Sequence, residues 1–159
     1  MLKASRTLPE GAARAAPNDT LTLPFELRQK SRLVATLASG RQIALALPRG
    51  NVLRGGTLLE ADDGSVVAVC SANEELSVVR SADPAALLRA AYHLGNRHVA
   101  LQMEAGALSY LHDHVLDDML HGLGLHPQVE QQPFEPEAGA YGRAGHHHHE
   151  HDRAHDHHH

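Results

Sequence analysis

The sequence contains a single cysteine, Cys70, in 159 residues. One cysteine excludes both an intramolecular disulfide framework and a cysteine-rich zinc site. The surrounding stretch, VVAVCSA, is apolar. We therefore expect Cys70 to be a small buried hydrophobic residue of a strand rather than a reactive thiol.

Long apolar runs and an excess of positive charge are missing as well. No run approaches the roughly 18 residues that a membrane-spanning helix needs, so we expect no membrane contact. The first 19 residues carry three bases but no continuous apolar core, unlike a secretory signal, and this predicts a cytoplasmic protein. Residues 1–145 hold 13 bases against 16 acids, which argues against nucleic acid as a partner.

Aromatic residues make up only 3% of the chain, and tryptophan is absent. A core must therefore consist mainly of Leu, Val and Ala, and the apolar content of 42% is sufficient for one ordinary domain or two small ones. The sequence shows no phosphate-binding loop and no set of nucleophile, base and acid. We therefore expect a protein that is not an enzyme.

The first half of the chain has the pattern of short β-strands. Apolar residues alternate with others through residues 33–37 and 43–47, which is the period of a half-buried strand, and Gly, Pro and Asp separate the runs. Residues 20–70 are predicted to be β throughout, after a mobile start. Short strands at this spacing predict a small all-β module of two packed sheets over residues 1–73.

The second half predicts strands that alternate with helices. Asp83 and Pro84 are a typical N-cap and first-turn pair, and Asp113 has the same capping role. The helices are expected over residues 84–94 and 114–124, and the strands over 75–81, 99–105, 107–111 and 127–134. The order βαββαβ predicts a ferredoxin-like domain over residues 74–141, an antiparallel sheet with two helices on one side.

Three histidines fall at the joints of this second domain. His98 follows a helix end where a strand is expected to begin, and His112 and His114 flank the start of the next helix. Imidazole is the commonest protein metal ligand, so these residues could form a transition-metal site. The alternative is that His98 caps its helix through the backbone and that His112 and His114 are simply exposed.

The last 14 residues, HHHHEHDRAHDHHH, hold nine of the 15 histidines. Acids, Arg153 and Ala154 interrupt the run, which no ordinary purification tag needs, although the final three histidines alone could come from a vector. The composition of residues 142–159 predicts a disordered His-rich tail that binds several ions loosely. The candidate ligands there are His146, His147, His148, His149, His151, His155, His157, His158 and His159.

Four stretches of the chain resemble the UreE family of urease accessory proteins, which are nickel metallochaperones. The stretches are LRGGTLLEADDGSVVAV, YHLGNRHVALQ, YLHDHVLDDMLHGLG and PFEPEAGAYG, the last just before the His-rich tail. The resemblance covers most of residues 40–159. One departure is Ala100, where the family often has proline.

This resemblance implies an N-terminal domain similar to a peptide-binding fold and a C-terminal domain that binds metal and forms a homodimer. The stretch GNRHV places the principal nickel ligand at His98, facing its symmetry mate across the dimer axis. The stretch HDHVLDDML carries secondary ligands onto His112 and His114, and tail histidines bind further ions. The family passes Ni(II) to the GTPase UreG and the complex that assembles the urease active site.

Spacing alone does not select nickel, because Cu(II), Zn(II) and Co(II) accept the same imidazoles. Two other functions also fit the residues. One is a soluble His-rich metal buffer or storage protein without a delivery role. The other is a metallohydrolase in which His98, His112 and His114, with Asp113 as a candidate fourth group, surround an activated water.

Overall fold

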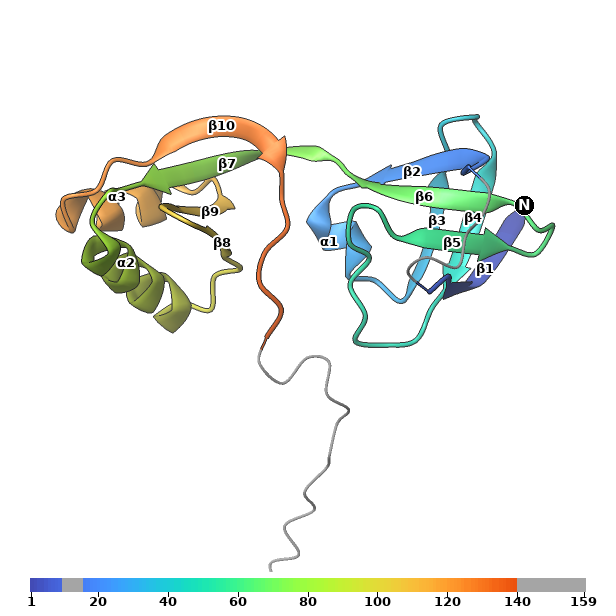
Figure 1. Cartoon of the computed structure of the whole chain (residues 1–159), viewed down its shortest axis with the longest axis horizontal. Coiled ribbons are helices and arrows are strands. Elements are labelled where there is room, and N and C mark those ends of the chain that lie inside the picture. Colours follow the sequence, from blue (N-terminus) through green and yellow to red (C-terminus); the bar gives the residue numbers. More distant parts are fainter. Residues whose placement is uncertain (10–15, 140–159) are drawn as a thin grey trace, which may run out of the picture.

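The structure, a computed structural model, describes residues 1–9 and 16–139. These residues form two units, each built on one sheet, that lie side by side (Figure 1). The predicted mixed α+β character is confirmed. The expected disordered tail over residues 142–159 lies outside the described residues.

The first unit is built on one six-stranded sheet, so the prediction of two packed sheets was wrong. Its strands lie in the order β2-β6-β5-β1-β4-β3. Just beyond β3, the N–H of Ala38 donates to the carbonyl of Thr20 in β2 at 2.9 Å. The two ends of the sheet meet at this bond, so one curled sheet surrounds the core on its own. The bounds are β1 Leu2–Thr7, β2 Asp19–Leu23, β3 Arg32–Thr36, β4 Gln42–Ala46, β5 Leu58–Ala61 and β6 Val66–Ser71.

Two parts of the first unit differ from the prediction. Residues expected to be a mobile start form β1, which lies between β4 and β5 and buries Ala4 in the core. Residues expected to continue a strand instead form α1, a single helical turn over Phe25–Arg28, so the module is not all β. The strand ends at Leu23 because Pro24 has no N–H to donate to the sheet.

The second unit has the predicted element order βαββαβ. Its strands lie in the order β10-β7-β9-β8, and all neighbours are antiparallel. Both helices pack on one face of this sheet, where Leu94 of α2 and Leu120 of α3 share a core with Val79 and Tyr110. The bounds are β7 Asn73–Arg80, α2 Pro84–Asn96, β8 Gln102–Glu104, β9 Ala107–Leu111, α3 His114–Gly122 and β10 Gln128–Pro133.

A buried arginine ties the two units together. Arg28 is fully buried and donates to the carbonyls of Leu23, Leu53 and Phe134 and, at 2.9 Å, to the carboxylate of Glu135. The chain after β10 is thus held between the units, as Figure 1 shows.

Glu135 is the hub of this junction. It also accepts from Arg54 at 3.1 Å and from the N–H of Gly55 at 3.0 Å. Burial acts to raise the pKa of Glu135, but the hydrogen bonds from Ser71, Gly55 and Arg54 and the charge of Arg28 outweigh it and hold the pKa below its usual value. The carboxylate is therefore ionised at neutral pH, as the neighbouring guanidinium groups require.

β8 is shorter than predicted, because residues 99–101 lie outside the sheet. Just before β8, the carbonyl of Leu101 accepts from the N–H of Glu137, in the segment after β10, at 2.8 Å. This hydrogen bond joins Glu137 to Leu101, which comes three positions after His98 in the sequence. Within the described parts of the chain, no helix has the length and apolar character needed to cross a membrane.

Candidate metal centre

His98 lies just beyond the C-terminal end of α2. The helix begins at Pro84, after the N-cap Asp83, whose carboxylate accepts from the N–H of Ala85 at 3.0 Å, and it ends at Asn96. The N–H of His98 then donates to the carbonyl of Gly95 at 3.0 Å, and that of Val99 to the carbonyl of Leu94 at 3.3 Å. These two bonds form a Schellman motif, with His98 in the left-handed position. The backbone of His98 therefore does cap the helix, while its imidazole is exposed.

The backbone of His98 is strained by this arrangement. Its φ is 57°, and among residues 1–9 and 16–139 it is the one non-glycine residue with positive φ. A side chain with a Cβ atom costs about 1–2 kcal/mol in this conformation, and glycine or asparagine is the usual occupant. Residues held in strained conformations of this kind cluster at functional sites.

His112 is held by a network of polar side chains. It follows β9, and its Nδ1 lies 3.0 Å from Ser77 Oγ and 3.2 Å from Asp117 Oδ2. The other carboxylate oxygen of Asp117 accepts from the hydroxyl of Tyr110 at 2.5 Å. The Asp117 carboxylate can only accept, so it favours the neutral tautomer with the proton on Nδ1, which leaves Nε2 as the metal-binding atom, while Ser77 Oγ can donate or accept.

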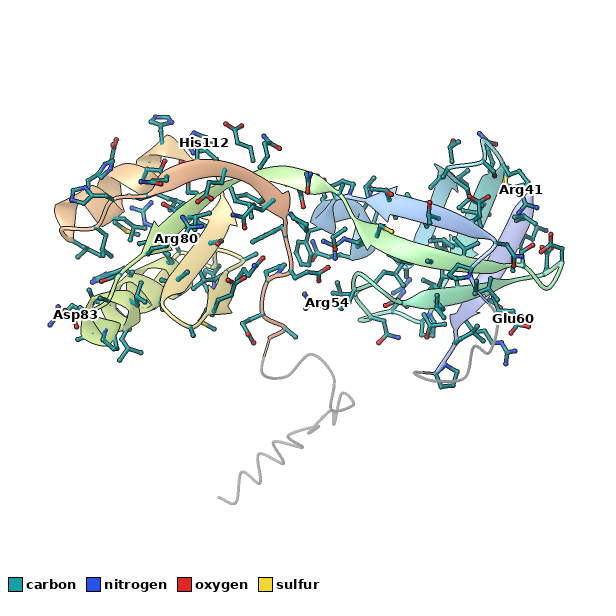
Figure 2. All side chains as sticks on the ribbon, turned by 45° about the horizontal axis from the view of Figure 1, so that its top comes forward. Arg41, Arg54, Glu60, Arg80, Asp83 and His112 are labelled. Atoms are coloured by element: carbon teal, nitrogen blue, oxygen red, sulfur yellow. The ribbon has the colours of Figure 1, made fainter. Side chains whose placement is uncertain are left out.

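Tyr110 completes this network as a neutral donor. Burial, with the hydrogen bond to Asp117, raises the pKa of Tyr110 far above its usual value. The phenol therefore keeps its proton and continues to orient Asp117. Figure 2 shows His112 on the second unit, well away from Asp83 at the start of α2.

His114 is the first residue of α3, and it is exposed. The preceding residue, Asp113, accepts from the N–H of Val115 at 2.8 Å and of Leu116 at 3.4 Å, as predicted for an N-cap. The Asp113 carboxylate therefore has a structural role in α3. This disfavours the metallohydrolase alternative, in which Asp113 would assist an activated water.

A single chain does not bring the three predicted histidines together. In residues 1–9 and 16–139, no three His, Cys, Asp or Glu side chains are close enough to hold one ion. His98 lies at the end of α2, whereas His112 and His114 lie at the start of α3. The nine tail histidines, from His146 to His159, fall outside the described residues.

The sequence reading did not identify the residues that orient His112. Tyr110 is fully buried in the core, and its hydroxyl donates to Asp117, a residue in the first turn of α3. Ser77 lies opposite Tyr110 on the neighbouring strand β7. No local pattern marks such a pair, because the two residues are 33 positions apart in the chain.

An apolar surface leads along α2 toward His98. Leu88 and Tyr92 lie one helical turn apart, and they are 71% and 65% exposed. Large exposed apolar side chains of this kind mark interaction sites when they adjoin one another.

Comparison with known proteins places both halves of the chain in one family. The family model described as UreE urease accessory protein, N-terminal domain, matches residues 1–72, and that of the C-terminal domain matches residues 74–159. The chain belongs to the UreE family of urease accessory proteins. Membership in the UreE family assigns it a role in urease maturation, as the resemblance implied.

Individual UreE proteins are similar over most of the chain. The urease accessory protein UreE of Alkalilimnicola ehrlichii is 62% identical over 137 residues, which are 86% of this chain and 84% of that protein. UreE of Pseudomonas putida is 54% identical over 147 residues, 92% of this chain and 87% of that protein. UreE of Citrobacter koseri is 54% identical over 136 residues, 85% of this chain and 90% of that protein.

Proposed function

We propose that this UreE-family protein binds Ni(II) as cargo and delivers it to the complex that assembles the urease active site. The observation that carries the proposal is His98, an exposed imidazole held at a strained position where glycine would be usual. Imidazole nitrogen is a suitable ligand for Ni(II), and also for Cu(II), Zn(II) and Co(II), which we expect to compete in vitro.

The principal site requires a second copy of the chain. One His98 is a single ligand, whereas a two-fold contact brings two identical residues together. We propose that the second domain has the ferredoxin-like fold and forms the homodimer. Its antiparallel strand order supports the fold, and the exposed Leu88 and Tyr92 on the helix that leads to His98 support the contact.

His112 and His114 act as secondary ligands in this proposal. The Asp117 contact supports this role for His112, because it leaves Nε2 free to bind a metal ion. The tail histidines, His146 to His159, act as a reservoir from which ions pass to the folded site. Since imidazole binds metal only as the neutral base, the reservoir should empty as the pH falls below about 6.5.

The expected partners are the GTPase UreG and the urease apoprotein in the cytoplasm. The chain has an accessory role in this scheme and catalyses no reaction itself. A metal buffer or storage protein without delivery is the second candidate, and the concentration of nine histidines in the last 14 residues favours it.

A nickel titration and a urease activation assay test the two candidates together. In the full chain, His98→Ala should remove the tightest nickel site and lower urease activation at limiting nickel. His93→Ala is the matched control, since His93 lies within α2 and outside the proposed sites. A chain ending at Gly145 should bind fewer ions but still activate urease when nickel is plentiful.

The opposite pattern would favour the buffer. Delivery through His98 is contradicted if His98→Ala leaves both the tightest site and activation unchanged. Loss of activation at saturating nickel in the chain ending at Gly145 would assign delivery to the tail instead.

A further inference from the structure

The C-terminal end of α3 holds two histidines in a fixed relation. The N–H of Gly124 donates to the carbonyl of His121 at 2.9 Å, and that of Leu125 donates to the carbonyl of Leu120 at 3.0 Å. Gly124 has a φ of 83°, and Leu125 is buried in the core beneath α3. The chain therefore folds back along the last turn of α3, and this brings His126, the residue after Leu125, close to His121.

The two imidazoles face one another across this turn. Their ring centroids are 6.2 Å apart, with 45° between the ring planes. Nδ1 of His121 lies 3.9 Å from Oδ1 of Asp118, one turn earlier on the same helix. The side chains of His121 and Asp118 are 52% and 76% exposed, and His126 is exposed as well, so solvent reaches the whole cluster.

This spacing is close to what a shared metal ion requires. Two imidazoles bound to one ion at about 2.0–2.1 Å place their ring centroids roughly 4.5–5 Å apart. The ring centroids must therefore approach by roughly 1.2–1.7 Å, which rotations of exposed side chains supply. The carboxylate of Asp118 lies 3.9 Å from Nδ1 of His121, beyond hydrogen-bond length, so it acts on a bound cation through its negative charge.

We infer that His121 and His126 bind one divalent transition-metal ion, with Asp118 as a nearby carboxylate whose negative charge favours the cation. A site of two imidazoles and water should bind Cu(II) more tightly than Ni(II). Zn(II) should occupy the same site at higher zinc concentration. Because the protein supplies only two ligands, this site should bind its ion with lower affinity than a site with three or four protein ligands. It is not needed for delivery through His98, so the inference goes beyond the proposed function.

The position of this pair on α3 relates it to the secondary site. His114, Asp118 and His121 are spaced by four and then three residues, so they share one face of the helix. All three are exposed. The seven residues from His114 to His121 correspond to about 10 Å along the helix axis. The pair thus offers a second position for an ion on the face that also carries His114.

Residue-resolved NMR of the isotope-labelled full chain provides the test. Cu(II) is paramagnetic, so an ion at the pair should broaden the amide signals of residues 118–128 selectively. The double variant His121→Asn with His126→Asn should abolish this broadening. Asp118→Asn should weaken Cu(II) binding at the pair by no more than about fivefold, because it removes an exposed negative charge near the ion. Broadening around His98 should persist in both variants.

Two comparisons keep the result interpretable. The spectrum of each variant without metal reports whether the fold is intact, and His93→Asn is the matched control that should leave the broadening of residues 118–128 unchanged. The inference is overturned if these residues show no selective broadening in the unmodified chain. It is equally overturned if the broadening survives the double variant, since the ion would then belong to other ligands, including the tail.

Discussion

The two helices of the second domain end in the same backbone motif but with different residues at its critical position. Beyond α2 the left-handed residue is His98, with a φ of 57°, and beyond α3 it is Gly124, with a φ of 83°. In both, the next residue donates its N–H to a carbonyl in the last turn, Val99 to Leu94 and Leu125 to Leu120. The geometry is shared, and only the side chain differs.

The two ends differ in the backbone strain that they carry. Glycine adopts the left-handed conformation without strain, so the end of α3 is the solution that favours folding. At the end of α2 the chain instead carries an imidazole at a cost of about 1–2 kcal/mol. The histidines near the end of α3, His121 and His126, lie on either side of the glycine and carry no such strain.

Replacing His98 with glycine should produce the largest change. In His98→Gly the tightest nickel site should weaken by at least about a hundredfold, since loss of an orienting partner alone costs 10- to 100-fold. The same change should raise the free energy of unfolding by about 1 kcal/mol, because the strain is relieved. Calorimetric nickel titration and urea unfolding measure the two effects. A less stable variant that retains the nickel site would contradict the comparison.

The reciprocal change at the end of α3 should act on stability alone. No atom lies within 4 Å of where a Cβ at Gly124 would be, so Gly124→Ala introduces only backbone strain. We expect a loss of about 1–2 kcal/mol in the free energy of unfolding, measured in urea, and no change in the tightest nickel site. Unchanged stability would show that the motif tolerates a Cβ without strain. It would then contradict the claim that the left-handed conformation of His98 is strained.

A third change contrasts the exposed ring of His98 with the held ring of His112. Asp117→Asn replaces the carboxylate that faces Nδ1 of His112 with an amide. We expect the secondary metal site to weaken by about tenfold and the tightest nickel site to remain. Cobalt or copper absorption spectra can follow the secondary site. If Asp117→Asn and His98→Ala affect the same site, the ranking of His98 above His112 is wrong.

The smallest effect on stability should come from asparagine at position 98. Asparagine is among the residues with a Cβ that adopt the left-handed conformation most readily. In His98→Asn we expect the free energy of unfolding to change by no more than about 0.5 kcal/mol, a typical value for a surface substitution, while the tightest nickel site is lost. This variant removes the imidazole but keeps the left-handed backbone, so it separates loss of the metal ligand from any change in backbone strain.

Features set by neighbouring residues were predicted well. Asp83 and Asp113 cap the two helices as expected, and the order of elements from β7 to β10 follows the predicted pattern. Each depends on contacts within a few residues, such as a carboxylate that accepts from the N–H two positions later. The position of His98 just beyond a helix end was visible for the same reason.

Other features of the fold depend on residues far apart in the chain. The parallel pairing of β1 with β4 joins segments about 40 residues apart, and the contact of Arg28 with Glu135 spans 107 residues. Sequence periodicity records which side of a strand is apolar, but it does not record which strand will lie beside it. The single curled sheet and the junction between the units were therefore not predicted.

The chemistry of the candidate site divides in the same way. The sequence by itself determined that imidazoles would lie at His98, His112 and His114 and in the tail, because ligand identity is a property of single residues. Only the tertiary structure decided that His98 is held in a left-handed conformation, that Asp117 and Ser77 orient His112, and that His126 turns back to His121. These relations are distances between side chains on different elements, and they exist only once the core has fixed those elements in place.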